Sequence, residues 1–201
     1  MSTKPEVFIV ESLDLDDEEN ELHEGHILSK ILAMSDKKCH YYYIRTKKEL
    51  KHVLALFNES QYRYLHLSCH AGKERMSTTF DKIPFGALAK MLKGNIGHRR
   101  LFLSACWMAR TELATAVLPE TDFISIMGFD TKVYVPDAAV FWASFYHLMF
   151  TADSKRMNND VLRSTTQALV NIHKLRLKYF AKDKALKTGF KPYTIEPKTQ
   201  T

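Results

Sequence analysis

A histidine and a cysteine each end an apolar segment of this chain, and the two could form a nucleophile–base pair. His70 follows the apolar run 63–69, and Cys106 follows the apolar run 100–105. A thiol attacks only as its thiolate, and an adjacent imidazole supplies the base that generates it. These residue types predict thiol chemistry, with His70 as general base and then acid and Cys106 as nucleophile.

The elements around the pair place both residues at one edge of a sheet. Both apolar runs indicate strands, and a helical segment from about 84 to 93 lies between them. Such a crossover makes the two strands parallel, with neighbours roughly 4.8 Å apart. Chemistry in open parallel sheets collects at their carboxyl edge. Backbone N–H groups near Gly72 and Cys106 are the predicted oxyanion donors, because Gly72 carries no side chain and Cys106 is expected where a strand turns into a helix.

Two alternatives compete with this interpretation of the pair. Cys69 is a second thiol, but adjacent residues of a strand point to opposite faces, so we expect it in the core rather than beside His70. A metal site built from Cys69, His70, Cys106 and His66 is the other alternative, although no two of them have a zinc-finger or zinc-ribbon spacing. The matched placement of His70 and Cys106 favours the nucleophile–base pair.

Length and composition predict one globular domain. The chain has 201 residues, of which 45% are hydrophobic, enough for a sizeable core. We expect this domain over residues 1–190 and a flexible tail over 191–201. Its three cysteines have no framework spacing, which argues against disulfides. Without a signal-peptide core or an apolar run of membrane-spanning length, a cytoplasmic location is expected.

Alternating strand and helix patterns predict an α/β fold with helices on both faces of the sheet. Thr46 and Glu49 have the spacing of a capping box at the start of a helix. Asp137 is expected to cap an apolar helix over 138–150. A basic amphipathic helix is predicted over about 161–184.

Charge is unevenly distributed along the chain, whose net charge is +6. The segment 14–24 is strongly acidic, and the chain is basic from Lys155 onward. The first interpretation is two solvated faces of opposite sign. The second is a partner site, with an acidic loop for a basic peptide and a basic helix for nucleic acid or an acidic protein.

The segments that carry the pair resemble a known family. Residues 65–72 (LHLSCHAG) and 101–106 (LFLSAC) are similar to the two signature segments of CHAT domains, which are caspase-like (clan CD) cysteine peptidases related to separase and the caspases. The similarity covers about residues 60–150 and continues through three further features, Gly128, the run 136–141 and the pair Phe145-Tyr146.

The resemblance implies a caspase-like three-layer αβα sandwich with a mostly parallel sheet of about six strands. It also implies a His–Cys dyad at His70 and Cys106 that cleaves peptide bonds in a protein partner, with no cofactor or metal. Ala71 departs from the family pattern, in which glycine directly follows the histidine. By the same resemblance the chain is expected to be a regulated effector, for instance in prokaryotic defence or cell death, that an activating or sensor protein switches on.

Relatives of this kind read a charged residue before the cut, and the sequence leaves its sign open. Asp130 and Glu74 are the candidates for binding a basic residue, while Arg75 and Arg110 would favour an acidic one. We favour the basic residue. Because no long linker follows the pair, activity is expected in a single uncut chain.

Two functions other than peptidase remain alternatives. A non-catalytic interaction module would keep the fold and use the same edge to bind a partner. A nucleic-acid-binding protein would use the basic C-terminal helix, but its charges are not interleaved with aromatic residues that stack on bases. Direct nucleic-acid or membrane binding is therefore not expected, and the sequence does not indicate an oligomeric state.

Overall fold

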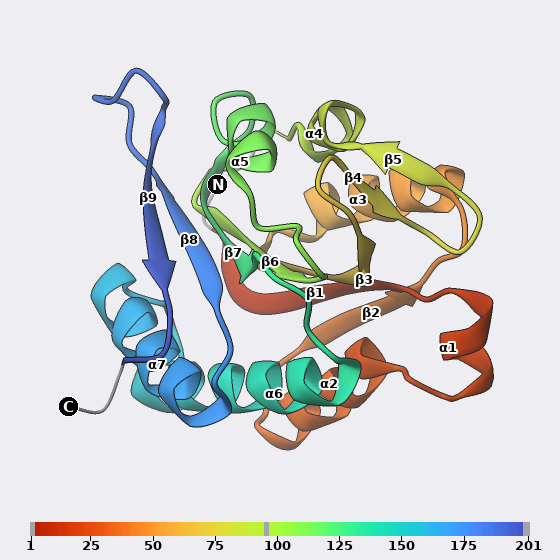
Figure 1. The fold of residues 1–201 in the computed structure, drawn as a ribbon, viewed down its shortest axis with the longest axis horizontal. Coiled ribbons are helices and arrows are strands. Elements are labelled where there is room, and N and C mark those ends of the chain that lie inside the picture. The colour runs from red at the N-terminus through yellow and green to blue at the C-terminus, as the bar shows by residue number, and fades with distance from the viewer. Residues whose placement is uncertain (1–2, 95–96, 199–201) are drawn as a thin grey trace.

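A nine-stranded sheet organises residues 3–94 and 97–198, the part of the chain that the computed structural model describes (Figure 1). Five strands run parallel, in the spatial order β2 (Cys39–Tyr43), β1 (Lys4–Ser12), β3 (Tyr62–Ala71), β6 (Arg99–Ser104) and β7 (Phe123–Phe129). Two antiparallel strands continue the sheet beyond β7, namely β8 (Leu177–Lys182) and β9 (Phe190–Ile195). The predicted α/β fold with a mostly parallel sheet is confirmed, with more strands than the six expected.

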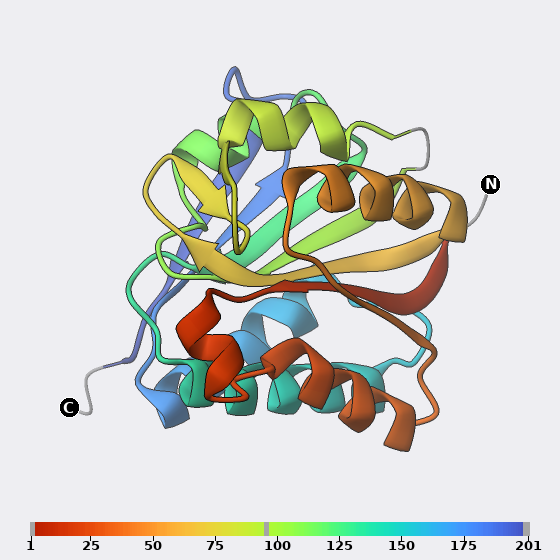
Figure 2. The ribbon, with the colours of Figure 1, turned by 90° about the vertical axis from the view of Figure 1, so that its right-hand side faces the viewer.

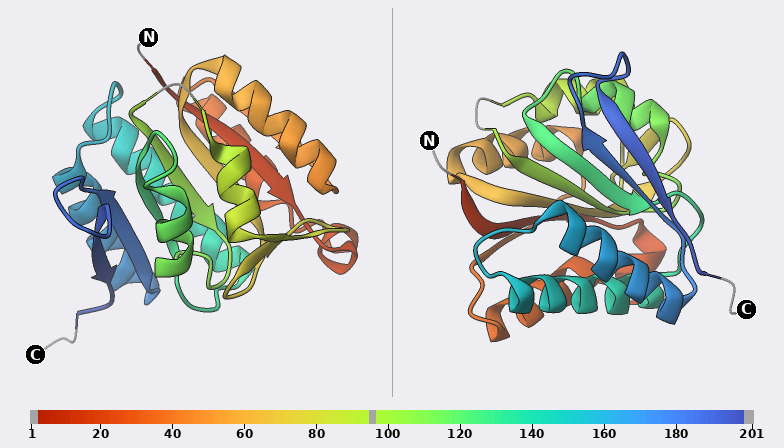
Figure 3. Two further views of the ribbon diagram at one scale, coloured as in Figure 1. Left: turned by 90° about the horizontal axis from the view of Figure 1, so that it is seen from above. Right: turned by 90° about the vertical axis from the view of Figure 1, so that its left-hand side faces the viewer.

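Helices cover both faces of this sheet (Figures 2 and 3). One face carries α3 (Lys47–Ser60), α4 (Phe85–Leu92) and α5 (Thr111–Val117). The other face carries α2 (Glu24–Met34), α6 (Val135–Ala152) and α7 (Asn159–His173). Because strand side chains alternate between faces, two separate apolar cores form, one on each side. None of the helices in the described ranges combines the length and apolar character needed to cross a membrane.

The predicted helical crossover between the strand before His70 and the strand before Cys106 is present. Helix α4 connects β3 to β6, and a small hairpin of β4 (Arg75–Ser77) and β5 (Lys82–Pro84) precedes it. The register of β3 on β6 sets Ser68 opposite Ser104. His70 and Cys106 therefore each lie two residues beyond the last matched pair of adjacent parallel strands.

Local capping agrees with the sequence at one helix and differs at another. The Thr46–Glu49 capping box at the start of α3 is present in full. Asp137, however, does not cap α6, since Tyr134 is the N-cap and Asp137 lies in the first turn. Pro136 explains the earlier start, because proline is favoured in the first helical turn.

The C-terminal helix begins as predicted but is shorter, and the structure after it differs from the prediction. The basic helix expected over 161–184 ends at His173, where Lys174 adopts a left-handed conformation, and β8 follows. The expected tail is ordered through Phe190–Ile195, which pairs with β8; residues 199–201 lie outside the described part. Two aromatic pairs across these strands, Tyr179 with Tyr193 and Phe180 with Phe190, stabilise the antiparallel extension.

Candidate functional site

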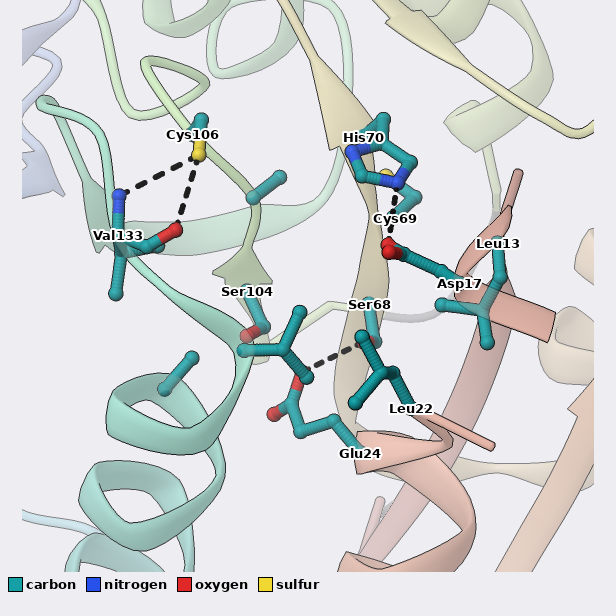
Figure 4. A pocket seen from close by; sticks show the side chains of 13 residues that line it. Leu13, Asp17, Leu22, Glu24, Ser68, Cys69, His70, Ser104, Cys106 and Val133 are labelled. Carbon is teal, nitrogen blue, oxygen red and sulfur yellow. Dashed lines mark hydrogen bonds and ion pairs between the residues drawn. The ribbon is translucent and has the colours of Figure 1, made fainter. Parts of the chain in front are cut away.

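A pocket lies at the carboxyl edge of the sheet, where β3 and β6 end (Figure 4). It encloses about 410 Å³ of empty space, part of it open to solvent. Its lining comes from the ends of β3 and β6, the segment after β1 and the start of α6: Leu13, Asp17, Leu22, Glu24, Ser68, Cys69, His70, Ser104, Ala105, Cys106, Val133, Val135 and Ala138. The fold thus brings His70 and Cys106 to one pocket.

The His70 ring lies against two carboxylates from the acidic segment. Its Nε2 is 2.8 Å from Asp17 Oδ2 and 3.3 Å from Asp14 Oδ2. Both acids belong to a short helix, α1 (Leu15–Glu19), which was expected to be a loop; Asp14 is its N-cap and accepts a hydrogen bond from the Asp17 N–H. The acidic segment therefore contributes directly to the site instead of forming only a solvated face.

Cys106 occupies a turn rather than the start of a helix. Trp107 has a φ of 55°, and α5 begins only at Thr111, so the expected helix N-terminus at the thiol is wrong. The Val133 N–H donates to Cys106 Sγ, and the thiol faces the Val133 carbonyl, both at 3.4 Å. Within the described residues, no hydrogen bond joins Cys106 to His70.

The backbone donors near the pair differ from those predicted. The Gly72 N–H donates to the Arg75 carbonyl at 2.9 Å and closes the β3–β4 hairpin, so it is already engaged. Bonded and non-bonded residue pairs alternate along an antiparallel ladder, so Ala71, which is opposite Met76, directs its N–H away from β4. The Cys106 N–H has no acceptor within the described part of the chain.

Cys69 is poorly suited to be the nucleophile. Burial raises the pKa of its thiol to about 12, and nearby Glu24 and Cys106 add to the increase. Its side chain packs against the core on the α3–α5 face. Cys69 nevertheless lines the pocket beside His70, although the two side chains alternate along β3 (Figure 4).

A buried carboxylate that no sequence pattern indicated lies at the inner end of the pocket. Glu24 is only 4% exposed, and its Oε2 accepts a hydrogen bond from Ser68 Oγ at 2.6 Å. Its Oε1 has no hydrogen-bond partner and lies 3.5 Å from His66 Nε2. His66 is fully buried and contacts the Tyr146 hydroxyl. A glutamate at the start of an amphipathic helix gives no sequence signal for such burial.

Glu11 fixes the start of helix α2, where Glu24 lies. Its Oε1 accepts a hydrogen bond from the Gly25 N–H at 2.6 Å, and its Oε2 accepts one from the Tyr41 hydroxyl at 2.7 Å. Burial raises the pKa of Glu11, and the Tyr41 and Gly25 hydrogen bonds partly oppose that increase. The carboxylate of Glu24 is therefore positioned by a buried polar network.

The possible metal ligands that the fold brings together differ from the four residues of the alternative metal site. His66 is directed into the buried network with Glu24 and Tyr146. In residues 3–94 and 97–198, the group with ligand atoms within 4.8 Å of one another is Asp14, Asp17 and His70. This set shares only His70 with the four residues that the sequence suggested.

The predicted substrate-binding residues lie outside the pocket. Asp130 is buried with its carboxylate 3.4 Å from Arg176 Nη2 and 3.8 Å from Lys178 Nζ, so the chain's own cations balance its charge. Glu74 is exposed in the turn between β4 and β3. Neither Arg75 nor Arg110 lines the pocket either.

Comparison with known proteins shows similarity in fold alone. No protein-family model and no curated protein matches the sequence. An inactive zymogen C11 protease from Parabacteroides distasonis has a TM-score of 0.60 and 13% identity, over 90% of this chain and 63% of that one. A secreted C11 cysteine protease from Bacteroides thetaiotaomicron has a TM-score of 0.61 and 10% identity, over 90% and 67% of the two chains. The chain therefore has a caspase-like fold and spans about two thirds of these proteases.

Proposed function

We propose that the protein is a caspase-like cysteine endopeptidase with a His70–Cys106 dyad. The register of β3 on β6 is the observation that carries the proposal, since it places both residues at equivalent strand ends on one pocket. His70 takes the thiol proton as Cys106 attacks the peptide carbonyl, and returns it to the leaving amine. Water, activated by His70, then hydrolyses the thioester. No step requires a metal or a cofactor.

Backbone N–H groups of Ala71 and Cys106 are the proposed oxyanion donors. The Ala71 N–H faces away from the hairpin, and that of Cys106 has no acceptor in the described part of the chain. Fixed backbone donors stabilise negative charge that develops on a carbonyl oxygen. Gly72 is replaced in this role because its N–H already closes the hairpin.

The pocket supports a preference for a basic residue before the cut. Apolar side chains form its walls, including Leu13, Leu22 and Val135, and Glu24 contributes Oε1, which accepts no hydrogen bond and lies 3.5 Å from His66 Nε2. A lysine or arginine fits this combination, because its aliphatic stem packs on apolar walls while its charge meets the carboxylate. Glu24 therefore takes the place of Asp130, whose charge is already paired.

We further propose that a second protein controls the activity. The resemblance to CHAT domains favours a regulated effector, with a role such as prokaryotic defence. Among the described residues no hydrogen bond joins His70 to Cys106, which fits a site that a partner completes. All three cysteines are free, which fits a reducing compartment such as the cytoplasm.

Peptide cleavage by matched cysteine variants tests the proposal. We expect the protein to cleave fluorogenic peptides that end in lysine or arginine faster than those ending in aspartate or leucine. Cys106→Ala should abolish cleavage, whereas Cys69→Ala should retain it. Cleavage that survives Cys106→Ala would contradict the proposal. Partner binding without any cleavage by the wild type would favour the non-catalytic interaction module.

A further inference from the structure

Asp17 holds the ring of His70 by a contact that the sequence did not reveal. Asp17 Oδ2 lies 2.8 Å from His70 Nε2, a hydrogen-bond distance between residues that are 53 positions apart. An ionised carboxylate only accepts hydrogen bonds, so Nε2 must carry the proton. Nδ1 of the neutral ring is then the basic nitrogen. In Figure 4 this second ring nitrogen lies on the side of His70 nearer to Cys106.

We propose that Asp17 is a positioning residue for the peptidase reaction: it fixes the tautomer and orientation of His70 and stabilises the imidazolium that forms when Cys106 loses its proton. This inference rests on the proposed dyad. The second carboxylate, Asp14 Oδ2, is 3.3 Å from the same nitrogen and 56% exposed, so its contribution is smaller.

Helix α1 is anchored independently of the contact with His70. Glu18, the next residue, accepts hydrogen bonds from the Tyr43 hydroxyl and from Arg45, at the end of β2. The Asp14 side chain caps the helix, and α1 has no buried residues. The helix therefore does not need the Asp17–His70 contact to stay in place, which argues against a merely structural ion pair.

Several charged or titratable side chains surround His70. Asp17 and Asp14 face the ring from α1 and its cap, and Glu24, Cys69 and Cys106 line the same pocket. Loss of the Asp17 charge removes the carboxylate that faces the imidazolium formed during thiol attack, so that step becomes less favourable.

Charge-removing variants of α1 test the proposal. Asp17→Asn keeps the side-chain shape and should lower kcat by about 10- to 100-fold, with little change in KM, because the wrong tautomer becomes accessible. Asp17→Glu, which keeps the charge, should restore part of the rate. Asp14→Asn keeps the cap and should have a smaller effect. Asp16→Asn, an exposed neighbour on the same helix, is the matched control and should behave like the wild type.

Alkylation of Cys106 gives a readout that does not need peptide cleavage. We expect iodoacetamide to modify Cys106 more slowly in Asp17→Asn than in wild type and Asp16→Asn, measured by peptide mass spectrometry at neutral pH. Unchanged kcat and unchanged alkylation in Asp17→Asn would overturn the positioning role even if Cys106→Ala is inactive. A raised KM for basic peptides at constant kcat would also overturn it and make Asp17 a substrate contact. Alkylation that depends on Asp17 in a protein without peptidase activity would support the Asp17–His70–Cys106 coupling and refute the proposed function.

Discussion

Two buried charged side chains lie at opposite ends of the central strands, and they differ in how fully they are hydrogen-bonded. Arg100, at the amino end of β6, is 5% exposed and donates to Ser125, Tyr179, Asn159 and the Met157 carbonyl. Glu24, at the carboxyl end, is 4% exposed but has a hydrogen bond to only one of its oxygens. The two side chains are almost equally buried, so they differ in hydrogen bonding: Arg100 donates to four acceptors, whereas Glu24 Oε1 accepts no hydrogen bond and lies 3.5 Å from His66 Nε2.

The largest effect is expected at the Arg100 end and on stability. Arg100→Met fills the same space but removes the donor from three buried acceptors, on Ser125, Tyr179 and Met157, and from the exposed Asn159, at about 3 kcal/mol in total because neighbours relax to satisfy some of them. Urea unfolding of the variant and wild type would measure this change. A loss below about 0.5 kcal/mol would contradict the view of Arg100 as a clamp that joins β6, β7, β8 and α7.

Glu24→Gln should do the opposite, with little effect on stability and a clear one on specificity. The amide keeps the acceptor for Ser68 and removes a buried charge, so the free energy of unfolding should change by less than about 1 kcal/mol. Cleavage after lysine or arginine should fall by roughly 10- to 100-fold, since a buried ion pair with the substrate is lost.

Two matched variants locate this specificity in the pocket. Glu74→Gln removes an exposed carboxylate of the hairpin turn, and Asp130→Asn removes one that Arg176 and Lys178 already balance. Neither should change the preference for a basic residue. If Asp130→Asn relaxes the preference and Glu24→Gln does not, the selecting carboxylate is Asp130, as the sequence first suggested.

The features that could be predicted from the sequence depend on local periodicity and on neighbouring strands. The crossover between the His70 and Cys106 strands and the Thr46 capping box followed from patterns within short segments. The contacts of Asp17 and Glu24 could not be predicted, because these residues meet His70 and Ser68 across 53 and 44 positions of the chain. An acidic run looks the same whether it is solvated or folded against a histidine.

The errors at the C-terminus had a consequence for the site. Residues 177–182 were assigned to a basic helix, so their antiparallel pairing with β7 was missed. That pairing brings Lys178, with Arg176 just before it, to Asp130 and neutralises the predicted substrate contact. The same error had supported a basic helix for nucleic acid, which the structure divides between α7 and β8.

Covalent labelling with a lysine-ending peptide chloromethyl ketone, followed by intact-mass and peptide analysis, tests the His70–Cys106 dyad most directly. We predict one adduct on Cys106 of an uncut chain, none in Cys106→Ala, and wild-type labelling in Cys69→Ala. Burial raises the pKa of the Cys69 thiol to about 12, so it stays largely protonated and unreactive at neutral pH. An adduct on Cys69, labelling that persists in Cys106→Ala, or a requirement for internal cleavage would contradict a single-chain peptidase with Cys106 as nucleophile.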